Sequence, residues 1–148
     1  PEQRTVGPGS IVDKQQHRQA PPRSLFSQGG PRCHACAAGL RGKCHTAGVI
    51  YQLTCTLCGK IYIGETGRMV RLRYNEHLRD ARNQRRDSPM GDHFRQEHHD
   101  VQQPDPTHLT ATILQITRRE RERKIAESLH IRKHHPALNT NVMSWNVV

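Results

Sequence analysis

Apolar and aromatic residues are scarce in this chain of 148 residues. Hydrophobic residues make up 33% of it and aromatic residues 4%, whereas typical globular domains are nearly half apolar. The sequence has no apolar run long enough to cross a membrane and no basic-then-apolar signal pattern at its N-terminus. These absences argue against a membrane protein and a secreted one. We therefore expect a soluble protein with one small core that a bound metal helps to stabilise.

Acidic residues are also few. The chain has 23 Lys and Arg against 13 Asp and Glu, which gives a formal net charge of +10, and it has 11 His. This balance is typical of proteins that bind a polyanion such as nucleic acid, although a solvated basic surface has the same sign. Five cysteines, an odd number, include two CxxC pairs. Such pairs with histidines nearby favour metal binding in a reducing compartment over a disulfide framework.

Composition divides the chain into three parts. Residues 1–30 are rich in Pro, Gly, Gln and Ser, and we interpret them as a flexible linker. Residues 31–47 form a Cys-rich segment that is too irregular for a helix, and residues 48–148 form the main domain. The first residue is Pro and not Met, so we expect that the sequence is a fragment of a longer protein.

Hydrophobic periodicity predicts the elements of the main domain. Strand patterns occupy residues 49–54, 61–64 and 109–117. Helical patterns occupy residues 69–86, a short stretch within 87–100, and residues 118–135 before Pro136. The expected fold is α+β, a small three-stranded antiparallel sheet flanked by helices and stapled by zinc. Two stripes should face the core: Val70, Tyr74, Leu78 and Ala81 on the first helix, and Ile125, Ala126 and Leu129 on the last.

Two tyrosines and two basic side chains form the first candidate site. Tyr51 and Tyr62 occupy similar places on the first two predicted strands. Tyrosine on a strand is usually a packing residue. However, Arg73 and His77 are four residues apart on the following helix and therefore share one face, which Arg71 and His77 do not.

These residues carry a resemblance to a known family. "VIY" at 49–51, "YIG" at 62–64, an arginine on the next helix, Glu127 on a later helix and Asn139 after it resemble the GIY-YIG endonucleases. The similar region runs from residue 48 to residue 141. Within that family, "YIGETGR", "RYNEH", the CxxC between the strands and "ESLHIRKHHPALN" resemble the endonuclease domain of Penelope-like retrotransposable elements. The first motif reads "GVIY", which keeps the tyrosine and changes packing only.

The resemblance implies a divalent-metal-dependent DNA endonuclease that nicks target DNA to prime reverse transcription. Glu127 would bind Mg²⁺ or Mn²⁺, for which a hard carboxylate is suited. Arg73 would hold the scissile phosphate, and Arg71 is the alternative that spacing leaves open. Tyr51 or His77 would be the general base. Tyr62 would position water or phosphate, and Asn139 would order the site.

The CxxC between the two strands predicts a structural zinc site. Zinc needs four ligands, and "GDHFRQEHH" supplies a histidine pair at suitable spacing. We expect Cys55, Cys58, His93 and His98 to bind the ion, with His99 as an alternative to His98. This set is similar to the zinc knuckle of the Penelope-like branch, and it would compensate for the small core.

The Cys-rich segment contains a second candidate zinc site. Cys33, Cys36 and Cys44 provide three sulfurs, and His45 or His34 would be the fourth ligand. The alternative is an irregular or disulfide-prone segment.

The resemblance also implies partners. The expected partners are DNA, an upstream reverse transcriptase in the same polypeptide and its RNA template, with no membrane, and the expected location is the nucleus. Five basic side chains are candidates for contact with DNA phosphate: Arg68, Arg71, Arg79, Arg82 and Lys133. The rival function is a noncatalytic, zinc-stabilised nucleic-acid-binding module. A redox role for the CxxC is disfavoured because the pair is not at the start of a helix in a βαβ unit.

Overall fold

The computed structural model describes residues 32–139. The predicted linker at residues 1–30 and the end of the predicted main domain, residues 140–148, lie outside the described residues. A short π-helical turn, η2 (Cys36–Leu40), comes first. The other elements are β1 (Ala47–Cys55), β2 (Ile61–Met69), α1 (Val70–Asn83), α2 (Pro89–Glu97), β3 (Leu109–Ile116) and α3 (Glu120–His134).

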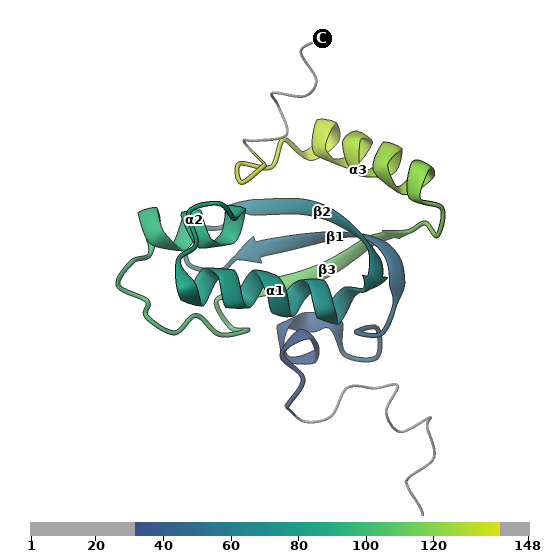
Figure 1. Ribbon diagram of the computed structural model, residues 1–148. Helices are drawn as coiled ribbons and strands as arrows, with labels where there is room; N and C mark the ends of the chain where they lie inside the picture. The colour runs from purple at the N-terminus through teal and green to yellow at the C-terminus, as the bar shows by residue number, and fades with distance from the viewer. Residues whose placement is uncertain (1–31, 140–148) are drawn as a thin grey trace, which may run out of the picture.

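The three strands form one antiparallel sheet in the order β2-β1-β3. Figure 1 shows α1 and α2 on one side of the sheet and α3 on the other. This arrangement confirms the predicted α+β fold. Within residues 32–139, no helix is both long and apolar enough to span a membrane.

The larger core lies between the sheet and the helices α1 and α2. The predicted stripe of α1 is confirmed, because Val70, Tyr74, Leu78 and Ala81 are all at most 1% exposed. Tyr74 also donates a hydrogen bond from its hydroxyl to the Leu109 carbonyl oxygen, 2.6 Å away on β3. This bond satisfies the hydroxyl that Tyr74 carries into the core.

A smaller core lies between the sheet and α3. It contains Ile50 and Ile63 from the strands and Ala126 and Ile131 from the helix. The predicted stripe of α3 is therefore wrong in two of its three members.

Ile125 is 54% exposed and Leu129 is 58% exposed. The buried position one turn before Ala126 is occupied by an arginine, Arg123, whose side chain pairs with Glu65 on β2. Ion pairing thus sets the rotation of α3 about its axis, where periodicity predicted apolar packing.

The Cys-rich segment belongs to the larger core. Ala35, Ala38, Leu40 and Cys44 are at most 2% exposed and join the same apolar cluster as β1 and α1. The prediction that this segment is too irregular for a helix is wrong at η2. Gly39 in that turn has a φ of 115°, and a Cβ there would lie 3.1 Å from the Ala111 carbonyl oxygen. Glycine is thus the residue that permits both the turn and its contact with β3.

The outer edge of β2 is covered by the chain that follows α3. Leu138 donates its backbone N–H to the Ile61 carbonyl oxygen at 3.1 Å. The Asn139 side chain accepts from the Ile63 N–H at 2.8 Å and donates to the Ile63 carbonyl oxygen at 2.7 Å. These bonds satisfy backbone groups that an edge strand would otherwise leave unpaired.

Candidate functional site

The register of the β1–β2 hairpin brings the two motif tyrosines together. Tyr51 pairs with Gly64, and Leu53 pairs with Tyr62, so both tyrosines project from the same face of the sheet. Their ring centroids are 6.4 Å apart. A Cβ at Gly64 would lie 2.6 Å from the Tyr51 hydroxyl oxygen and 2.8 Å from Cε1 of Tyr62. The glycine therefore provides the space in which the two rings meet.

Helix α1 adds an imidazole to the tyrosine pair. The Tyr51 hydroxyl oxygen and His77 Nε2 are 2.7 Å apart, in a buried hydrogen bond. The His77 ring also meets the Tyr62 ring edge-on, with centroids 5.3 Å apart. His77 Nδ1 is buried and has no hydrogen-bond partner among the described residues. Such a buried polar atom is costly and is more common at functional sites than in ordinary cores.

Arg73 lies one turn before His77 and directs its charge at both tyrosines. It lowers the pKa values of Tyr51 and Tyr62, against the larger effect of burial, which raises both. Its Nη1 also donates to Glu76 Oε2 at 2.8 Å. The structure therefore places Arg73 beside the tyrosines, as the predicted pairing with His77 requires. The neighbouring Arg71 uses its backbone N–H to bind the Cys44 carbonyl oxygen at 3.0 Å.

Burial keeps the Tyr51–His77 pair uncharged. Burial raises the pKa of Tyr51, and the charge that a nearby Tyr62 would carry raises it further. Burial, assisted by the positive charge of Arg73, lowers the pKa of His77 to about 3. The pair consequently holds a neutral hydroxyl and a neutral imidazole at physiological pH.

Glu127 approaches the tyrosines from α3. Burial and the Glu65 carboxylate raise the pKa of Glu127 to about 7, while Lys124 opposes the shift. The charge of Glu127 in turn raises the pKa values of both Tyr51 and Tyr62. Neither neighbouring cation is paired with Glu127, because Lys124 pairs with Glu120 and Arg123 with Glu65. The carboxylate is therefore available to a ligand.

Asn139 meets this group through the backbone of β2. Its side chain binds the backbone of Ile63, the residue between Tyr62 and Gly64. Asn139 thus holds the strand that carries Tyr62, and the structure gives it no direct contact with the tyrosine rings. Four of the six predicted catalytic side chains, Tyr51, Tyr62, Arg73 and His77, come together, and Glu127 on α3 interacts with the tyrosines electrostatically.

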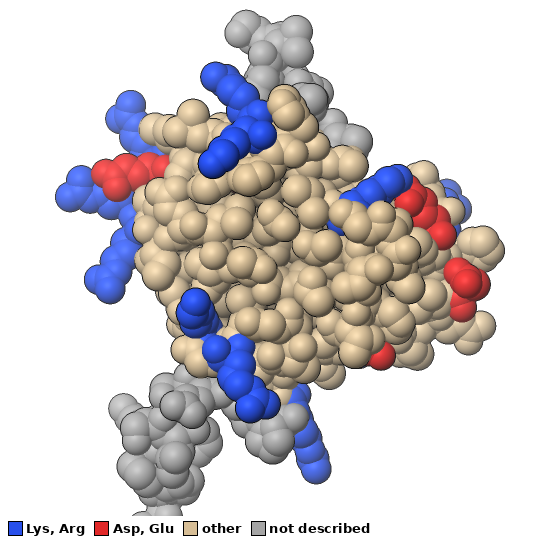
Figure 2. Space-filling model, turned by 180° about the vertical axis from the view of Figure 1, so that it is seen from behind, with Lys and Arg blue, Asp and Glu red and all other residues tan. Residues whose placement is uncertain are grey.

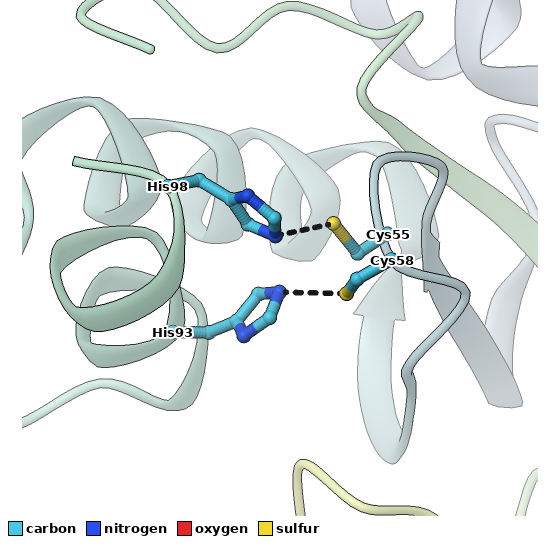
Figure 3. Close-up of side chains that lie close together, drawn as sticks. All are labelled: Cys55, Cys58, His93 and His98. Carbon is cyan, nitrogen blue, oxygen red and sulfur yellow. Dashed lines mark hydrogen bonds between the residues drawn. The ribbon is translucent and has the colours of Figure 1, made fainter. Parts of the chain in front are cut away.

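The hairpin cysteines and the α2 histidines form a separate cluster that could hold zinc (Figure 3). Cys55, Cys58, His93 and His98 each offer one ligand atom, and all four atoms lie within 4.8 Å of one another. Cys55 Sγ is 3.5 Å from His98 Nε2, and Cys58 Sγ is 3.5 Å from His93 Nε2. Ligands at about 2.3 Å (sulfur) and about 2.05 Å (nitrogen) from a tetrahedral zinc would be about 3.6 Å apart. The observed separations match this value.

The surroundings of His93 also suit a zinc ligand. Its Nδ1 faces Glu97 Oε1 at 3.8 Å, and Glu97 forms an ion pair with Lys60. Histidines that bind metal through one ring nitrogen usually orient the other toward a carboxylate or carbonyl. His98, and not the alternative His99, completes the cluster, while His99 is exposed and its carbonyl oxygen accepts a hydrogen bond from Gln84 at 3.4 Å.

The Cys-rich segment also brings its sulfurs together. The sulfur atoms of Cys33, Cys36 and Cys44 all lie within 4.8 Å of one another. His45 Nδ1 is 3.4 Å from the Cys44 sulfur, although His45 is not a member of this three-residue group. His34 is exposed. The CxxC of this segment and the later CH pair thus converge on one point of the fold.

Three of the predicted DNA-contacting residues, Arg68, Arg79 and Arg82, line one surface pocket beside α1. Arg68 is exposed and pairs with Glu76 at 2.7 Å, and Arg82 donates from Nε to the Pro104 carbonyl oxygen at 2.8 Å. Arg79 and Lys133 are exposed on α1 and α3, which cover opposite faces of the sheet. Figure 2 shows one face on which basic side chains lie around the margin and uncharged residues fill the middle. Lys133, on α3, is therefore separated from the three arginines that share the pocket beside α1.

Two residues of the site were missed at the level of sequence, Glu65 and Arg123. Arg123 donates from Nε to Glu65 Oε2 and from Nη1 to the Arg118 carbonyl oxygen at 3.0 Å. A Cβ at Gly67 would lie 2.9 Å from Arg123 Nη2, so glycine makes room for the guanidinium. The two partners are 58 residues apart in the chain, and no local pattern signals such a pair.

Comparisons of the chain with family models, with curated proteins and with solved structures found no match.

Proposed function

We propose that this chain is a divalent-metal-dependent DNA endonuclease of the GIY-YIG type, acting for a retroelement by nicking DNA at the site of reverse transcription. The observation that carries the proposal is the convergence of two tyrosines, an arginine and a neutral histidine from three separate elements, with the carboxylate of Glu127 near enough to affect both tyrosines electrostatically. The resemblance of residues 48–141 to that family supplies the reaction. The net charge of +10 is consistent with a polyanionic substrate.

Proton transfer is assigned to the Tyr51–His77 pair. Hydrolysis of a phosphodiester requires a group that takes a proton from the attacking water. The Tyr51 oxygen would accept that proton as its own hydroxyl proton passes to His77 Nε2, 2.7 Å away. Burial and the charge of Arg73 lower the pKa of His77 to about 3, so the imidazole is uncharged before the reaction and disfavours a proton. The relay would avoid a free tyrosinate, which burial disfavours, but it requires the negative charge that develops on the phosphate to stabilise the imidazolium.

Stabilisation of the negative charge on the phosphate is assigned to Arg73. Its guanidinium is fixed by the bond to Glu76 at 2.8 Å and lies beside both tyrosines. A guanidinium matches the geometry of two phosphate oxygens and stabilises the negative charge that grows on them.

The catalytic metal is assigned to Glu127. Mg²⁺ or Mn²⁺ prefers carboxylate oxygen and retains several water ligands, and Glu127 is half-buried, unpaired and close to the second carboxylate of Glu65. This donor set fits such an ion. A bound ion would activate water and stabilise charge on the leaving oxygen.

The test is plasmid nicking by the wild type and three variants. With Mg²⁺ or Mn²⁺, we expect the wild type to nick supercoiled DNA, and we expect Glu127→Ala and Arg73→Ala to lose at least about a hundredfold in rate. Glu122→Ala, on the exposed face of the same helix, is the matched control and should retain wild-type activity.

DNA binding, measured without added Mg²⁺ or Mn²⁺ and with the structural zinc retained, separates catalysis from affinity. Both inactive variants should bind DNA within about threefold of the wild type, since the many other phosphate contacts remain. If the wild type binds DNA and nicks it with neither metal, the noncatalytic binding module is the correct function. If Glu127→Ala retains full activity, the site assignment is wrong.

A further inference from the structure

We propose that Cys33, Cys36, Cys44 and His45 bind a second structural zinc ion, and that this ion fixes the N-terminal end of α1. The first observation is the convergence of three sulfurs within 4.8 Å of one another. Cys33 lies just before η2, Cys36 is the first residue of η2, and Cys44 lies in the turn that leads into β1. Three cysteines gathered from two places in the chain form the greater part of a closed tetrahedral zinc site.

His45 is the fourth ligand in this proposal. Its Nδ1 is 3.4 Å from the Cys44 sulfur, close to the sulfur–nitrogen separation of about 3.6 Å around a tetrahedral zinc. His45 does not lie within 4.8 Å of all three sulfurs, so its ring must move to bind an ion that they hold. His45 is half-buried, which limits access of solvent to the fourth position.

The link to α1 is made by backbone hydrogen bonds. The first N–H groups of a helix have no partner within the helix, and Met69 at the N-cap provides no side-chain bond. Instead, the Val70 N–H binds the Thr46 carbonyl oxygen at 2.9 Å, and the Arg71 N–H binds the Cys44 carbonyl oxygen at 3.0 Å. One residue, Cys44, thus contributes its sulfur to the zinc cluster and its carbonyl to the start of the helix.

The position of α1 matters because the helix carries Arg73 and His77. Arg73 lies at the end of the first turn of α1, two residues after Arg71, whose N–H is the second of the capped groups. A zinc ion on the cluster would hold residues 41–46 in place and, through them, the beginning of the helix. The hairpin zinc site lies at the other end of β1, where Cys55 ends the strand. The two sites would therefore fix opposite ends of the central strand.

Zinc content provides the first test, made on the reduced full chain and independent of nuclease activity. We expect two zinc ions per chain in the wild type, one in Cys33→Ser and one in the matched hairpin variant Cys58→Ser. Cys33 is chosen because it is partly exposed, whereas Cys44 is fully buried in the core. A wild type with a single zinc that Cys33→Ser retains would overturn the proposal.

Thiol counting separates zinc from a disulfide. When the wild type, purified without reductant, is unfolded with a chelator, five titratable thiols are expected, equal to the five cysteines of the chain. A count of three, with Cys33→Ser restoring four, would mean that the cluster forms a disulfide and would overturn the zinc assignment.

Cobalt substitution tests the fourth ligand. Co²⁺ should give a tetrahedral visible spectrum in Cys58→Ser, where the hairpin site is lost, and His45→Ala in that background should shift the visible bands. An unchanged spectrum would overturn the assignment of His45.

Hydrogen exchange tests the effect on α1. In Cys33→Ser, the amides of Val70 and Arg71 should exchange about tenfold faster than in the wild type, because their acceptors are no longer held. In Cys58→Ser these two amides should remain protected. Equal protection of both amides in all three proteins would overturn the proposed link between the zinc cluster and the helix, whatever the outcome of the nicking assay.

Discussion

Replacing Asn139 with alanine should destabilise the domain, although this residue belongs to no helix or strand. Its side chain is 3% exposed in a buried position beside β2. Its amide makes the hydrogen bonds that a neighbouring strand would make, since it binds both the N–H and the carbonyl oxygen of Ile63. The alanine variant would leave one N–H and one carbonyl oxygen of β2 without their partners.

The magnitude follows from these two groups. A buried polar group that loses its partner costs about 1–3 kcal/mol. Water entering the space left by the amide would satisfy part of this demand at the edge of the sheet. We therefore expect the free energy of unfolding to fall by about 2–4 kcal/mol, a large share of the stability of a small domain.

Urea unfolding followed by far-ultraviolet circular dichroism, with zinc present, measures this loss. Asn139→Asp keeps the acceptor for the Ile63 N–H but faces the Ile63 carbonyl with a second oxygen, so it should be at least as unstable as Asn139→Ala. Asn75→Ala, at an exposed position on α1, should change stability by less than about 0.5 kcal/mol. If Asn139→Ala and Asn139→Asp both stay within that limit, the side chain does not hold β2.

Three further changes test other parts of the site. Gly64→Ala introduces a methyl group 2.6 Å from the Tyr51 hydroxyl oxygen. Because the tyrosine ring must move, we expect the nicking rate to fall at least about tenfold while the zinc content stays unchanged. Full activity would contradict the tight fit around Gly64. Removal of zinc by a chelator, or Cys58→Ser, should lower the melting temperature and activity together, because binding of structural zinc is part of the folding free energy; rescue by excess Mg²⁺ would argue against a structural role. Because the pKa of His77 is lowered to about 3 in the folded state and is about 6.5 when unfolded, the unfolded chain binds the extra proton between these values. The free energy of unfolding should therefore fall by up to about 2 kcal/mol as the pH is lowered from 8 to 5. Urea unfolding at both pH values should show a smaller fall in His77→Gln, which retains the same zinc ligands, and an equal fall in both proteins would refute a buried neutral imidazole.

Local patterns predicted the elements in which the spacing of apolar residues alone determines which face is buried. The spacing of Val70, Tyr74, Leu78 and Ala81 predicted the buried face of α1 because all four side chains pack against the sheet. The strand pattern of β2 predicted its start but not its end. "ETGR" looks like a turn, yet β2 continues to Met69 because Ala47 and Val49 of β1 pair with this part of the chain. Such pairing is set by the partner strand and not by the intrinsic preference of the residues.

The candidate site was only partly predictable for the same reason. Helical spacing placed Arg73 and His77 on one face, and the resemblance supplied Glu127. Neither could reveal that Arg123 and Glu65 lock α3 to β2, because that pair joins two segments far apart in the chain. Sequence spacing favoured His98 but left His99 as an alternative, and the way the chain leaves α2 places His98 in the cluster.

The unequal cores on the two faces of the sheet set the order in which the domain opens. Among the described residues, the apolar side chains that α3 buries are only Ala126 and Ile131, whereas the other face buries tyrosine, phenylalanine, methionine and leucine side chains. Segments with few buried apolar contacts open at the lowest free energy. On mild heating α3 should therefore leave the sheet first and withdraw the Glu127 carboxylate, while the half that holds Tyr51 and His77 stays folded. We expect this opening to reverse on cooling, because the folded sheet remains as the surface on which the helix packs again.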